Sequence, residues 1–461
     1  MAVRVRLVAR VLALDIGTSS VRACLFDETA EEHAEPARRD YPGEYDPDVL
    51  LAHTREAIEE AGGAEKADAV GSACFGHSLL ALDRHGRPLT EILSWRDTRS
   101  ADAADRLLQR VDAAAVRRRT GCYIHTSYWP AKLAWLAEEQ PEVFHSAHRF
   151  VSFSDYLYAQ LLGREVPASI SMASPTGLVD LRARSWDEEL LETLGVDAER
   201  LPVISDAPVE GWYPALLDGA CSNFGAGCVT RERAALMVGT SGAIRVVYET
   251  KTPDPRPALF LHWVDGTRVV EGGSLSDGGN LYAWMEQTFK DDGKGSLADR
   301  DPDSHGLTFL SLLGGERSPG WHQHAKGAIQ GLTFDTTPLD LRQAGLEGVA
   351  FRFAAVARLM PEIEEIVVTG GALLRDDDWV QIMADALGRP VTRSGVGEAS
   401  LRGAAVVVLE RLGETPAPAP LGPVVEPRPD KVEAFRAARE RQQRLYEVVT
   451  SEPRRRLDGA A

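Results

Sequence analysis

Two segments of the chain share one pattern of apolar and polar positions. In each, an apolar stretch enters Gly-Thr-Ser and continues as a second apolar stretch that ends in arginine; the copies span residues 11–22 and 235–245. Such a pattern is typical of a β-hairpin. Glycine lets a ligand approach the backbone, while Thr and Ser hydroxyls and turn N–H groups can bind phosphate oxygens. One Gly-Thr-Ser is usually an ordinary turn, but its repetition predicts two related domains around one polyphosphate.

The rest of the pattern predicts alternating strands and helices. We expect strands that run from Ala67 toward Gly76 and over Glu362–Thr369, and a helix whose first residue is Pro130. Six prolines between Pro416 and Pro429 predict a linker. Helices are predicted over residues 47–62, most of 99–139 outside an interruption at 120–130, 155–162, 281–290, 377–387 and 430–449. The predicted domains span residues 1–231, 232–425 and 426–461, the last being a helix and tail.

Charge and cysteine content narrow the class of protein. The 461 residues include 51 basic and 69 acidic ones, and the formal net charge of −18 argues against nucleic-acid or acidic-membrane partners. The five cysteines form no metal-ligand pattern, which favours a reducing cytoplasm and buried thiols. Neither a signal-peptide core nor an apolar stretch of membrane-spanning length is found, so we expect a cytoplasmic protein without membrane contact.

Two aspartates are candidates for chemistry beside these turns. Asp15 comes two residues before the first turn glycine, where the second copy has Met237. A carboxylate at this place is suited to Mg²⁺ held together with substrate phosphates, although it could instead cap the turn. Asp218 begins a run of small residues. It could cap a helix, or it could accept the proton of a substrate hydroxyl near a phosphate site.

Polar and aromatic residues gather in the first half of the chain. Tryptophan packs on the apolar face of a sugar, Asp, Arg and His bind hydroxyls, and Arg also suits a carboxylate. The alternative is that Trp95 and Trp129 are core residues and that Asp97 pairs with Arg99 at the surface. The group comprises His77, Ser78, Trp95, Asp97, Arg99, His125, Tyr128 and Trp129.

Together these segments resemble the FGGY carbohydrate kinase family from Leu12 to about Gly413. Two positions depart from the family pattern: Leu217 precedes Asp218 where many members have Gly, and Arg375 stands where a small or amide residue is common. The segments that carry the resemblance are Asp15 to Arg22, Trp95 to Arg99, Lys132 to Leu136, Asp218 to Gly225, Gly239 to Gly242, Gly314 to Pro319, Gly370 to Ala372, Gln381 to Pro390 and Glu398 to Gly403.

The resemblance implies an α/β, two-domain actin-like ATPase fold of the ribonuclease H-like type, with ATP and sugar in a cleft between the domains. It implies ATP and Mg²⁺ as cofactors, Asp218 as catalytic base, and Asp15 with Asp218 as metal ligands. The implied nucleotide and phosphate contacts are Gly17, Thr18, Ser19, Arg22, Gly239, Thr240, Gly279, Gly371 and Arg375. The implied sugar contacts are Gly76, His77, Trp95, Asp97 and Arg99.

The expected activity is phosphorylation of a sugar or sugar-acid hydroxyl, and a homodimer is compatible with the sequence. Residues 120–130 and 171–177 are most similar to members described as gluconate kinases, which makes gluconate the first expected substrate. A pentulose kinase such as xylulokinase is the alternative. A catalytically silent sugar-sensing protein is an alternative of another class, against which the intact Asp15, Asp218 and both Gly-Thr-Ser turns argue.

Overall fold

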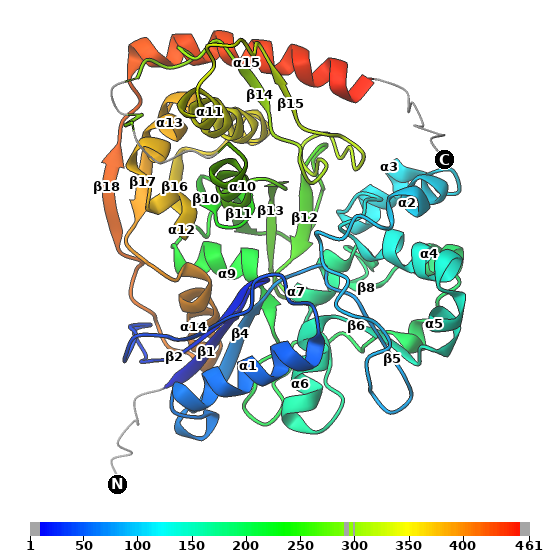
Figure 1. Cartoon of the computed structure of the whole chain (residues 1–461). Coiled ribbons are helices and arrows are strands. Elements are labelled where there is room, and N and C mark those ends of the chain that lie inside the picture. The colour runs from blue at the N-terminus through cyan, green and yellow to red at the C-terminus, as the bar shows by residue number, and fades with distance from the viewer. Residues whose placement is uncertain (1–9, 290–294, 298–299, 452–461) are drawn as a thin grey trace, which may run out of the picture. The chain divides into compact units, whose positions relative to one another are not determined.

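A computed structural model describes residues 10–289, 295–297 and 300–451 of the chain (Figure 1). Its residues form two compact units, each assembled from segments that are separate in the sequence. The first unit contains residues 1–235, 245–272 and 394–421, and the second contains 236–244, 273–393 and 422–461. Within the described part of the chain, every helix is too short or too polar to span a bilayer.

The sheet of the first unit has the strand order β3-β2-β1-β4-β9. Its centre is β1 (Val11–Ile16), whose residues are all buried and which pairs antiparallel with β2 (Ser20–Phe26) and parallel with β4 (Ala69–Cys74). Helix α14 (Ala399–Leu412) packs on β1 and β4. A hairpin followed by a parallel strand therefore places the first Gly-Thr-Ser turn at the end of a buried strand.

Helices form most of the remaining first unit. Three of them, α2 (Ala101–Leu108), α4 (Trp129–Glu139) and α8 (Glu188–Leu194), contribute to one apolar core. The other elements of this unit are β3 (Ala37–Asp40), α1 (Pro47–Glu60), β5 (Leu80–Leu82), α3 (Ala113–Thr120), α5 (Pro141–Ser146), β6 (Arg149–Val151), α6 (Phe153–Leu162), α7 (Ile170–Ala173), β7 (Val179–Asp180), β8 (Ser185–Trp186), β9 (Leu216–Leu217), α9 (Asp218–Gly225) and β12 (Phe260–Trp263).

A second sheet has the strand order β12-β13-β11-β10-β16-β17-β18. The second hairpin of the repeated pattern consists of β10 (Arg233–Val238) and β11 (Gly242–Glu249). The other strands that have not yet been given bounds are β13 (Arg268–Leu275), β16 (Glu365–Thr369), β17 (Val391–Ser394) and β18 (Leu421–Val425), with the small β14 (Thr308–Leu310) and β15 (Ala328–Gln330) pair outside this sheet.

Five helices belong to the second unit: α10 (Gly279–Phe289), α11 (Pro338–Ala357), α12 (Gly371–Leu374), α13 (Asp377–Leu387) and α15 (Pro429–Ser451), counted over the described residues. The long α15 is fixed by a buried amide, because Gln442 donates to the carbonyls of Phe309 at 2.8 Å and Gly348 at 3.0 Å. This helix is therefore an integral part of the unit.

The predicted elements agree with the structure at most positions. Both hairpins are confirmed, and the helix predicted over 377–387 has those bounds. Pro130 is the second helical residue, since α4 begins at Trp129. The last residue of the helix predicted over 281–290 lies outside the described residues. The predicted linker at 416–429 is wrong in part, because β18 forms an edge strand within it, where Pro423 is tolerated.

Candidate active site

The first Gly-Thr-Ser turn joins β1 and β2 beside a buried carboxylate. The Gly17 N–H donates to the Ser20 carbonyl at 2.9 Å, and the Tyr41 hydroxyl donates to the Gly17 carbonyl at 2.9 Å. Asp15 lies directly opposite Arg22 across the two strands. The Arg22 Nη1 donates to the Asp15 Oδ2 at 2.9 Å, so the hairpin holds its own carboxylate in a fixed position.

Three carboxylates share this corner of the first unit. Burial raises the pKa of Asp15 to about 6, with Arg22 opposing the rise and the negative charges of Asp218 and Glu398 adding to it. Arg22 also forms an ion pair with Glu398 at 3.1 Å. A buried carboxylate with acidic neighbours favours an added positive charge, which is the electrostatic condition for binding a cation.

Asp218 is the first residue of α9, and the N-cap position belongs to Leu217. Asp218 is therefore not the helix cap that the sequence suggested, although its Oδ1 accepts the Gly219 N–H at 2.7 Å. Nearby, Arg245 is buried and donates to the Gly219 carbonyl at 3.1 Å. Burial lowers the pKa of Arg245, and the charge of Asp218 opposes that effect.

The small residues after Asp218 serve helix packing. A methyl group on Gly225 would come within 1.8 Å of the Ala399 carbonyl oxygen, and one on Gly403 would come within 1.8 Å of the Cys221 carbonyl oxygen. Helices α9 and α14 thus touch backbone to backbone, which only glycine permits at these positions. Close helix packing accounts for Gly225, whereas a methyl group on Gly219 would meet the Arg245 side chain at 2.9 Å.

His77 and Gly76 follow the buried end of β4. A methyl group on Gly76 would lie 2.4 Å from the Leu217 side chain. His77 has a positive φ of 64°, which is rare for a residue other than glycine, and its Nδ1 donates to the Pro175 carbonyl at 2.6 Å. Its ring meets that of Tyr128 edge-on, with centroids 5.0 Å apart. The backbone and both neighbours therefore fix the direction of this imidazole.

Beneath His77 lies a buried lysine. Lys132 is 1% exposed, and its Nζ donates to the carbonyls of His77 and Ser127. Burial lowers the pKa of Lys132 to about 7, while the charge of Asp97 opposes this effect. A group that titrates near neutrality beside the predicted sugar contacts is typical of functional sites.

Asp97 and Arg99 form the pair that the alternative interpretation predicted. The Arg99 Nε lies 3.0 Å from both Asp97 carboxylate oxygens, and its Nη2 donates to Glu91 at 2.7 Å. Trp95 is half-buried, whereas Trp129 is buried and donates to the Ser78 carbonyl. Trp129 is thus a core residue, and Arg99 holds the carboxylate of Asp97 in place.

In the second unit, three glycine-containing turns converge. The Gly279 N–H donates to the Gly239 carbonyl at 2.8 Å, and the Asn280 N–H donates to the Thr240 carbonyl at 3.0 Å. Gly370 has a φ of 94°, and a methyl group there would lie 2.4 Å from the Val238 carbonyl oxygen. The Gly-Thr-Ser turn, the start of α10 and the start of α12 are therefore packed together.

The glycines of these turns differ in what they contact. A methyl group on Gly279 would lie 2.6 Å from the Gly239 carbonyl oxygen, so internal packing requires glycine there. On Gly239 the nearest contact would be the Met237 sulfur at 3.5 Å, and on Gly371 it would be Arg375 at 4.0 Å. Both are ordinary contact distances. Packing against the described residues therefore does not require glycine at positions 239 and 371.

A hollow of about 520 Å³ adjoins these turns within the second unit. Gly279, Tyr282 and Arg375 line it, and Arg375 is exposed. Ligand pockets commonly have volumes of roughly 300 to 1,000 Å³. The hollow therefore brings two of the predicted nucleotide positions, Gly279 and Arg375, to one place that is large enough for part of a nucleotide.

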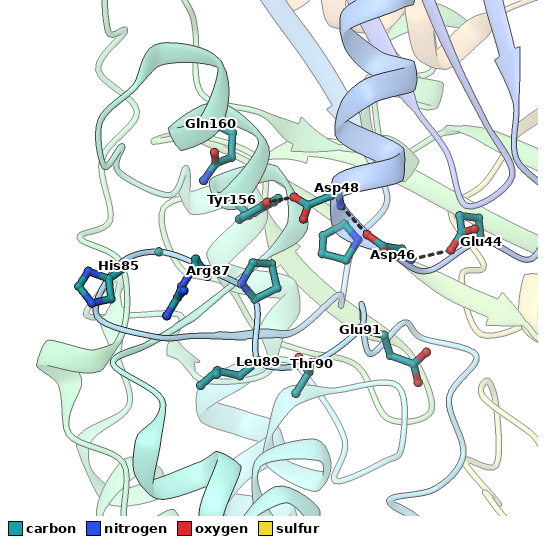
Figure 2. Close-up of a pocket in the computed structure, with 13 residues that line it drawn as sticks. Glu44, Asp46, Asp48, His85, Arg87, Leu89, Thr90, Glu91, Tyr156 and Gln160 are labelled. Atoms are coloured by element: carbon teal, nitrogen blue, oxygen red, sulfur yellow. Dashed lines mark hydrogen bonds between the residues drawn. The ribbon is translucent and has the colours of Figure 1, made fainter.

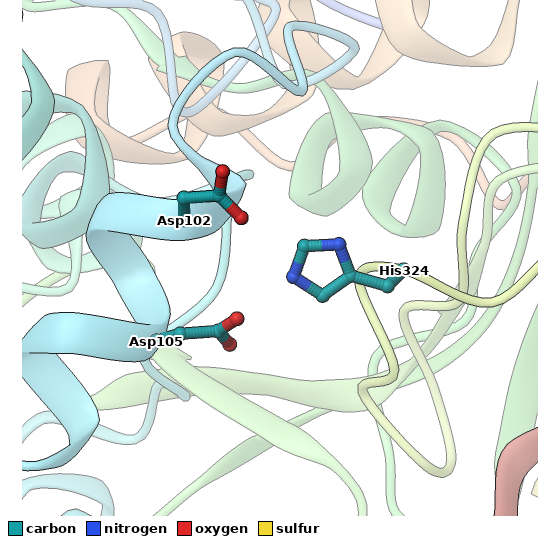
Figure 3. A group of neighbouring side chains, drawn as sticks. All are labelled: Asp102, Asp105 and His324. Carbon is teal, nitrogen blue, oxygen red and sulfur yellow. The ribbon is translucent and has the colours of Figure 1, made fainter. Parts of the chain in front are cut away.

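Two acidic groups lie outside these sites. Figure 2 shows a first-unit hollow where Asp46 accepts the Asp48 N–H at 2.8 Å and Asp48 accepts a hydrogen bond from the Tyr156 hydroxyl. The Asp46 carboxylate therefore caps α1, and the Asp48 carboxylate joins α1 to α6. On α2, Asp102 and Asp105 lie about one turn apart (Figure 3). His324, drawn in the same figure, belongs to the second unit and is not part of this first-unit pair.

A third group, in the second unit, has the residue types and spacing of a metal site, because Asp303, His305 and Glu347 each place one ligand atom within 4.8 Å of the others. His305 accepts the Leu307 N–H through Nδ1 at 2.9 Å, so its Nε2 carries the proton toward Glu347, 3.0 Å away. Glu347 also accepts from Gln343 and from the Asp303 N–H. The oxygen and nitrogen atoms are already used in hydrogen bonds, which identifies a structural network.

Four residues of these sites were not singled out as contacts from the sequence. Glu398 and Lys132 lie in segments that carry the family resemblance, and Arg245 ends the second copy of the repeat, so each carried a signal. His262 carried none. It is buried, which lowers its pKa to about 3, and its ring stacks on Phe260 with centroids 4.7 Å apart.

Comparison with known families places most of the chain in one group. Residues 10–210 match the model of the N-terminal domain of the FGGY family of carbohydrate kinases, and residues 234–409 match the model of its C-terminal domain. Helix α15 lies beyond both matched segments.

Individual relatives and solved structures agree with this match. The chain is 27% identical over 453 residues to a gluconokinase of Bacillus subtilis, which covers 87% of this chain and 88% of that protein. It is 32% identical to a glycerol kinase of Leptothrix cholodnii, covering 86% and 89% respectively. The crystal structure of a gluconate kinase from Lactobacillus acidophilus superposes with a TM-score of 0.84 at 24% identity, covering 97% and 99%. This likeness confirms the predicted two-domain fold class.

Proposed function

The chain belongs to the FGGY family of carbohydrate kinases, and from that premise we propose that it transfers the γ-phosphate of ATP to a hydroxyl of gluconate. The observation that carries the catalytic part of this proposal is the pair of carboxylates beside the first Gly-Thr-Ser turn. Asp15 is buried with a raised pKa, and Asp218, at the start of α9, is one of the charges that raise it. A phosphoryl-transfer site needs both a cation-binding carboxylate and an acceptor for the hydroxyl proton.

In this proposal Asp218 accepts the proton of the attacking substrate hydroxyl. The hydroxyl oxygen bonds to the γ-phosphorus of ATP, and the bond between the γ-phosphorus and the β-phosphate oxygen breaks to release ADP. Because such transfer depends chiefly on positioning and charge neutralisation, Asp218 does not need to be a strong base. Arg245, buried beside Gly219, supplies positive charge that favours the ionised form of Asp218. Leu217, where many family members have Gly, is the N-cap residue and leaves Asp218 at the first helical position.

Mg²⁺ fits the donor set at this corner. Asp15 and Asp218 offer hard carboxylate oxygens, and the raised pKa of Asp15 means that a cation would relieve an electrostatic cost. A bound Mg²⁺ would neutralise charge on the phosphates during transfer. The Arg22 Nη1 donates to the Asp15 Oδ2 at 2.9 Å and so fixes the orientation of this carboxylate.

We assign the phosphate and nucleotide contacts to the two units separately. In the first unit, the Gly17, Thr18 and Ser19 turn and Arg22 bind phosphate oxygens. In the second unit, Gly239 and Thr240 bind phosphates, while Gly279, Gly371 and Arg375 bind the nucleoside. The ordinary contact distances found for a methyl group on Gly239 or Gly371 support these two assignments. The 520 Å³ hollow beside Gly279 and Arg375 supports the nucleoside position.

The sugar contacts in this proposal are Gly76, His77, Trp95 and Asp97, with Arg99 acting through Asp97. The Asp97 carboxylate is held ionised, since hydrogen bonds from Arg99 lower its pKa against the effect of burial. An ionised carboxylate accepts hydroxyl protons well. Asp97 and Glu91 already bind the Arg99 guanidinium. In this proposal, binding a substrate carboxylate is therefore not the main role of Arg99.

Gluconate is proposed on two grounds. The segments 120–130 and 171–177 resemble gluconate kinases, and a relative named gluconokinase aligns over 87% of the chain. A relative named glycerol kinase is 32% identical, so glycerol must be tested beside it. Few pocket contacts decide such specificity, and a missing hydrogen bond to one substrate hydroxyl can change it strongly.

The test is release of ADP by the purified protein with Mg-ATP against gluconate, xylulose, glycerol and a panel of other aldonates and polyols. We expect gluconate to give a kcat/KM at least tenfold above the others, an order set by one or two polar contacts. A higher kcat/KM for glycerol or xylulose would overturn the gluconate assignment and leave the kinase assignment intact. The Arg99→Ala variant should lose activity equally on gluconate and xylulose if Arg99 acts only by holding Asp97.

A further inference from the structure

A groove rich in arginine lies between α11 and α15 in the second unit. Its volume is about 690 Å³, and five of its ten lining residues are arginines, with Glu440 as the single carboxylate. The chain as a whole has a net charge of −18, so this concentration of positive charge is unusual for it. We call it the arginine groove; its arginines are Arg352, Arg358, Arg436, Arg439 and Arg444.

Intramolecular ion pairs account for two of these arginines. The buried Arg352 pairs with Glu316, and Arg436 pairs with Glu433 at 3.1 Å. Arg358, Arg439 and Arg444 have no ion-pair partner among the described residues 10–289, 295–297 and 300–451. Three guanidinium groups without an ion pair therefore line one hollow, where the charge of Glu440 partly offsets that of Arg439.

Arg439 is only partly satisfied by the residues around it. Its Nη1 donates to the Ala386 carbonyl, but its Nε is buried and has no hydrogen-bond partner within the described part of the chain. Burial and, to a smaller extent, the positive charges of Arg358 and Arg436 lower the pKa of Arg439 to about 10, while the charge of Glu440 opposes this effect. The mutual repulsion of these positive charges costs stability, and an anion in the groove would relieve it.

Of the three arginines without an ion pair, one lies at a helix end. Arg358 is the C-cap residue of α11, where a positive side chain favours the helix dipole. Arg439 and Arg444 lie in the interior of α15, so neither of them caps a helix end. The groove has the volume of a small-molecule site, and the overall negative charge of the chain opposes extended polyanions such as nucleic acid.

We propose that the arginine groove binds a small phosphorylated molecule that carries at least two negative charges. Arginine forms paired hydrogen bonds with phosphate oxygens, and guanidinium groups on two facing helices can bind two anionic groups of one ligand. This site is separate from the turns assigned to ATP, because none of its lining residues belongs to the Gly-Thr-Ser turn or to the hollow beside Gly279.

The experiment titrates the full-length protein with inorganic pyrophosphate by calorimetry. The test variant is Arg358→Gln/Arg444→Gln, because both residues are exposed and their loss should leave the fold intact. We expect its affinity to fall by roughly tenfold or more, given the strength of charge-assisted hydrogen bonds. The matched control is Arg118→Gln/Arg182→Gln, which removes two exposed arginines of the first unit and should leave the affinity unchanged.

Thr240→Ala separates this site from the phosphate-binding turn. Pyrophosphate binding that persists in Thr240→Ala and weakens in Arg358→Gln/Arg444→Gln supports the proposal. The proposal is overturned if wild-type protein binds no pyrophosphate, if both double variants weaken binding equally, or if only Thr240→Ala weakens it. Arg439→Gln provides a second measurement, in which pyrophosphate binding should fall; its melting temperature is recorded beside it, because the variant also loses the hydrogen bond from Nη1 to the Ala386 carbonyl.

Discussion

The two Gly-Thr-Ser hairpins have turns of equal length but different charge. Three residues separate β1 from β2 and three separate β10 from β11. Two residues before the glycine, the first hairpin has Asp15 and the second has Met237. The backbone pattern is thus repeated without the carboxylate, which shows that the apolar strands and the turn specify the hairpin while single polar residues specify its chemistry.

The arginines of the two hairpins differ by one position, and this has a structural consequence. Arg22 comes five residues after Gly17 and lies opposite Asp15, whose carboxylate it binds. Arg245 comes six residues after Gly239. A shift of one residue in a strand moves a side chain to the other face, and Arg245 binds the Gly219 carbonyl beside Asp218. Arg22 therefore binds Asp15, whereas Arg245 places its positive charge near Asp218.

The largest expected effect comes from removing the acid assigned to proton transfer. Asp218→Asn should lower kcat by roughly 100- to 10,000-fold, the usual contribution of a general base, while ADP still binds. Asp254→Asn, at an exposed first-unit carboxylate, is the matched control and should keep wild-type turnover. Initial rates of ADP release and calorimetry with ADP measure the two quantities. Near-normal turnover of Asp218→Asn would remove Asp218 from this role.

Local pattern was enough to predict both hairpins, and distance along the chain explains what it missed. Each hairpin depends on neighbouring residues, so its apolar strands and turn are visible in sequence. Glu398, which pairs with Arg22, lies almost at the other end of the chain. Gly225 of α9 packs against α14, which also lies far along the sequence. Such contacts follow from tertiary packing, and no short pattern encodes them. The edge strand β18 was missed because its prolines suggested a linker.

The second expected effect distinguishes two glycines of the second hairpin region. Gly239→Ala should raise the KM for ATP by about tenfold through lost phosphate contacts, with little change in melting temperature, because its methyl group has room. Gly279→Ala should lower stability by roughly 1 to 3 kcal/mol, because its methyl group would collide with the Gly239 carbonyl. Steady-state kinetics and thermal unfolding of both variants give the comparison.

These two variants are controls for each other. If Gly239→Ala were strongly destabilised, the turn glycine would be needed for packing and its assignment to phosphate would lose support. If Gly279→Ala were stable with an unchanged KM, the close contact between α10 and the turn would not restrict the site. The expected result is a change in KM without a loss of stability for Gly239→Ala, and a loss of stability for Gly279→Ala.

The smallest expected effect concerns the charge balance around Asp15. Its pKa of about 6 lies above the ordinary value of 3.8, so the carboxyl group is protonated as the pH falls through 6, and kcat/KM should decline there. Arg22 lowers this pKa and Glu398 raises it. Arg22→Gln should therefore move the acid limb of the pH profile upward by roughly one unit, and Glu398→Gln should move it downward by roughly half a unit.

The opposite signs make this prediction specific to the first hairpin. A loss of stability or of phosphate binding would lower the rate at every pH without moving the limb, so the midpoint of the profile is the informative quantity. Arg182→Gln, an exposed arginine of the same unit, should leave the midpoint unchanged. Shifts of the same sign in Arg22→Gln and Glu398→Gln would show that the limb belongs to another group. Opposite shifts would identify Asp15 as the titrating carboxylate. The two copies of the turn would then differ in function, because only the first copy carries an acid, and the arginine of the same hairpin controls the pKa of that acid.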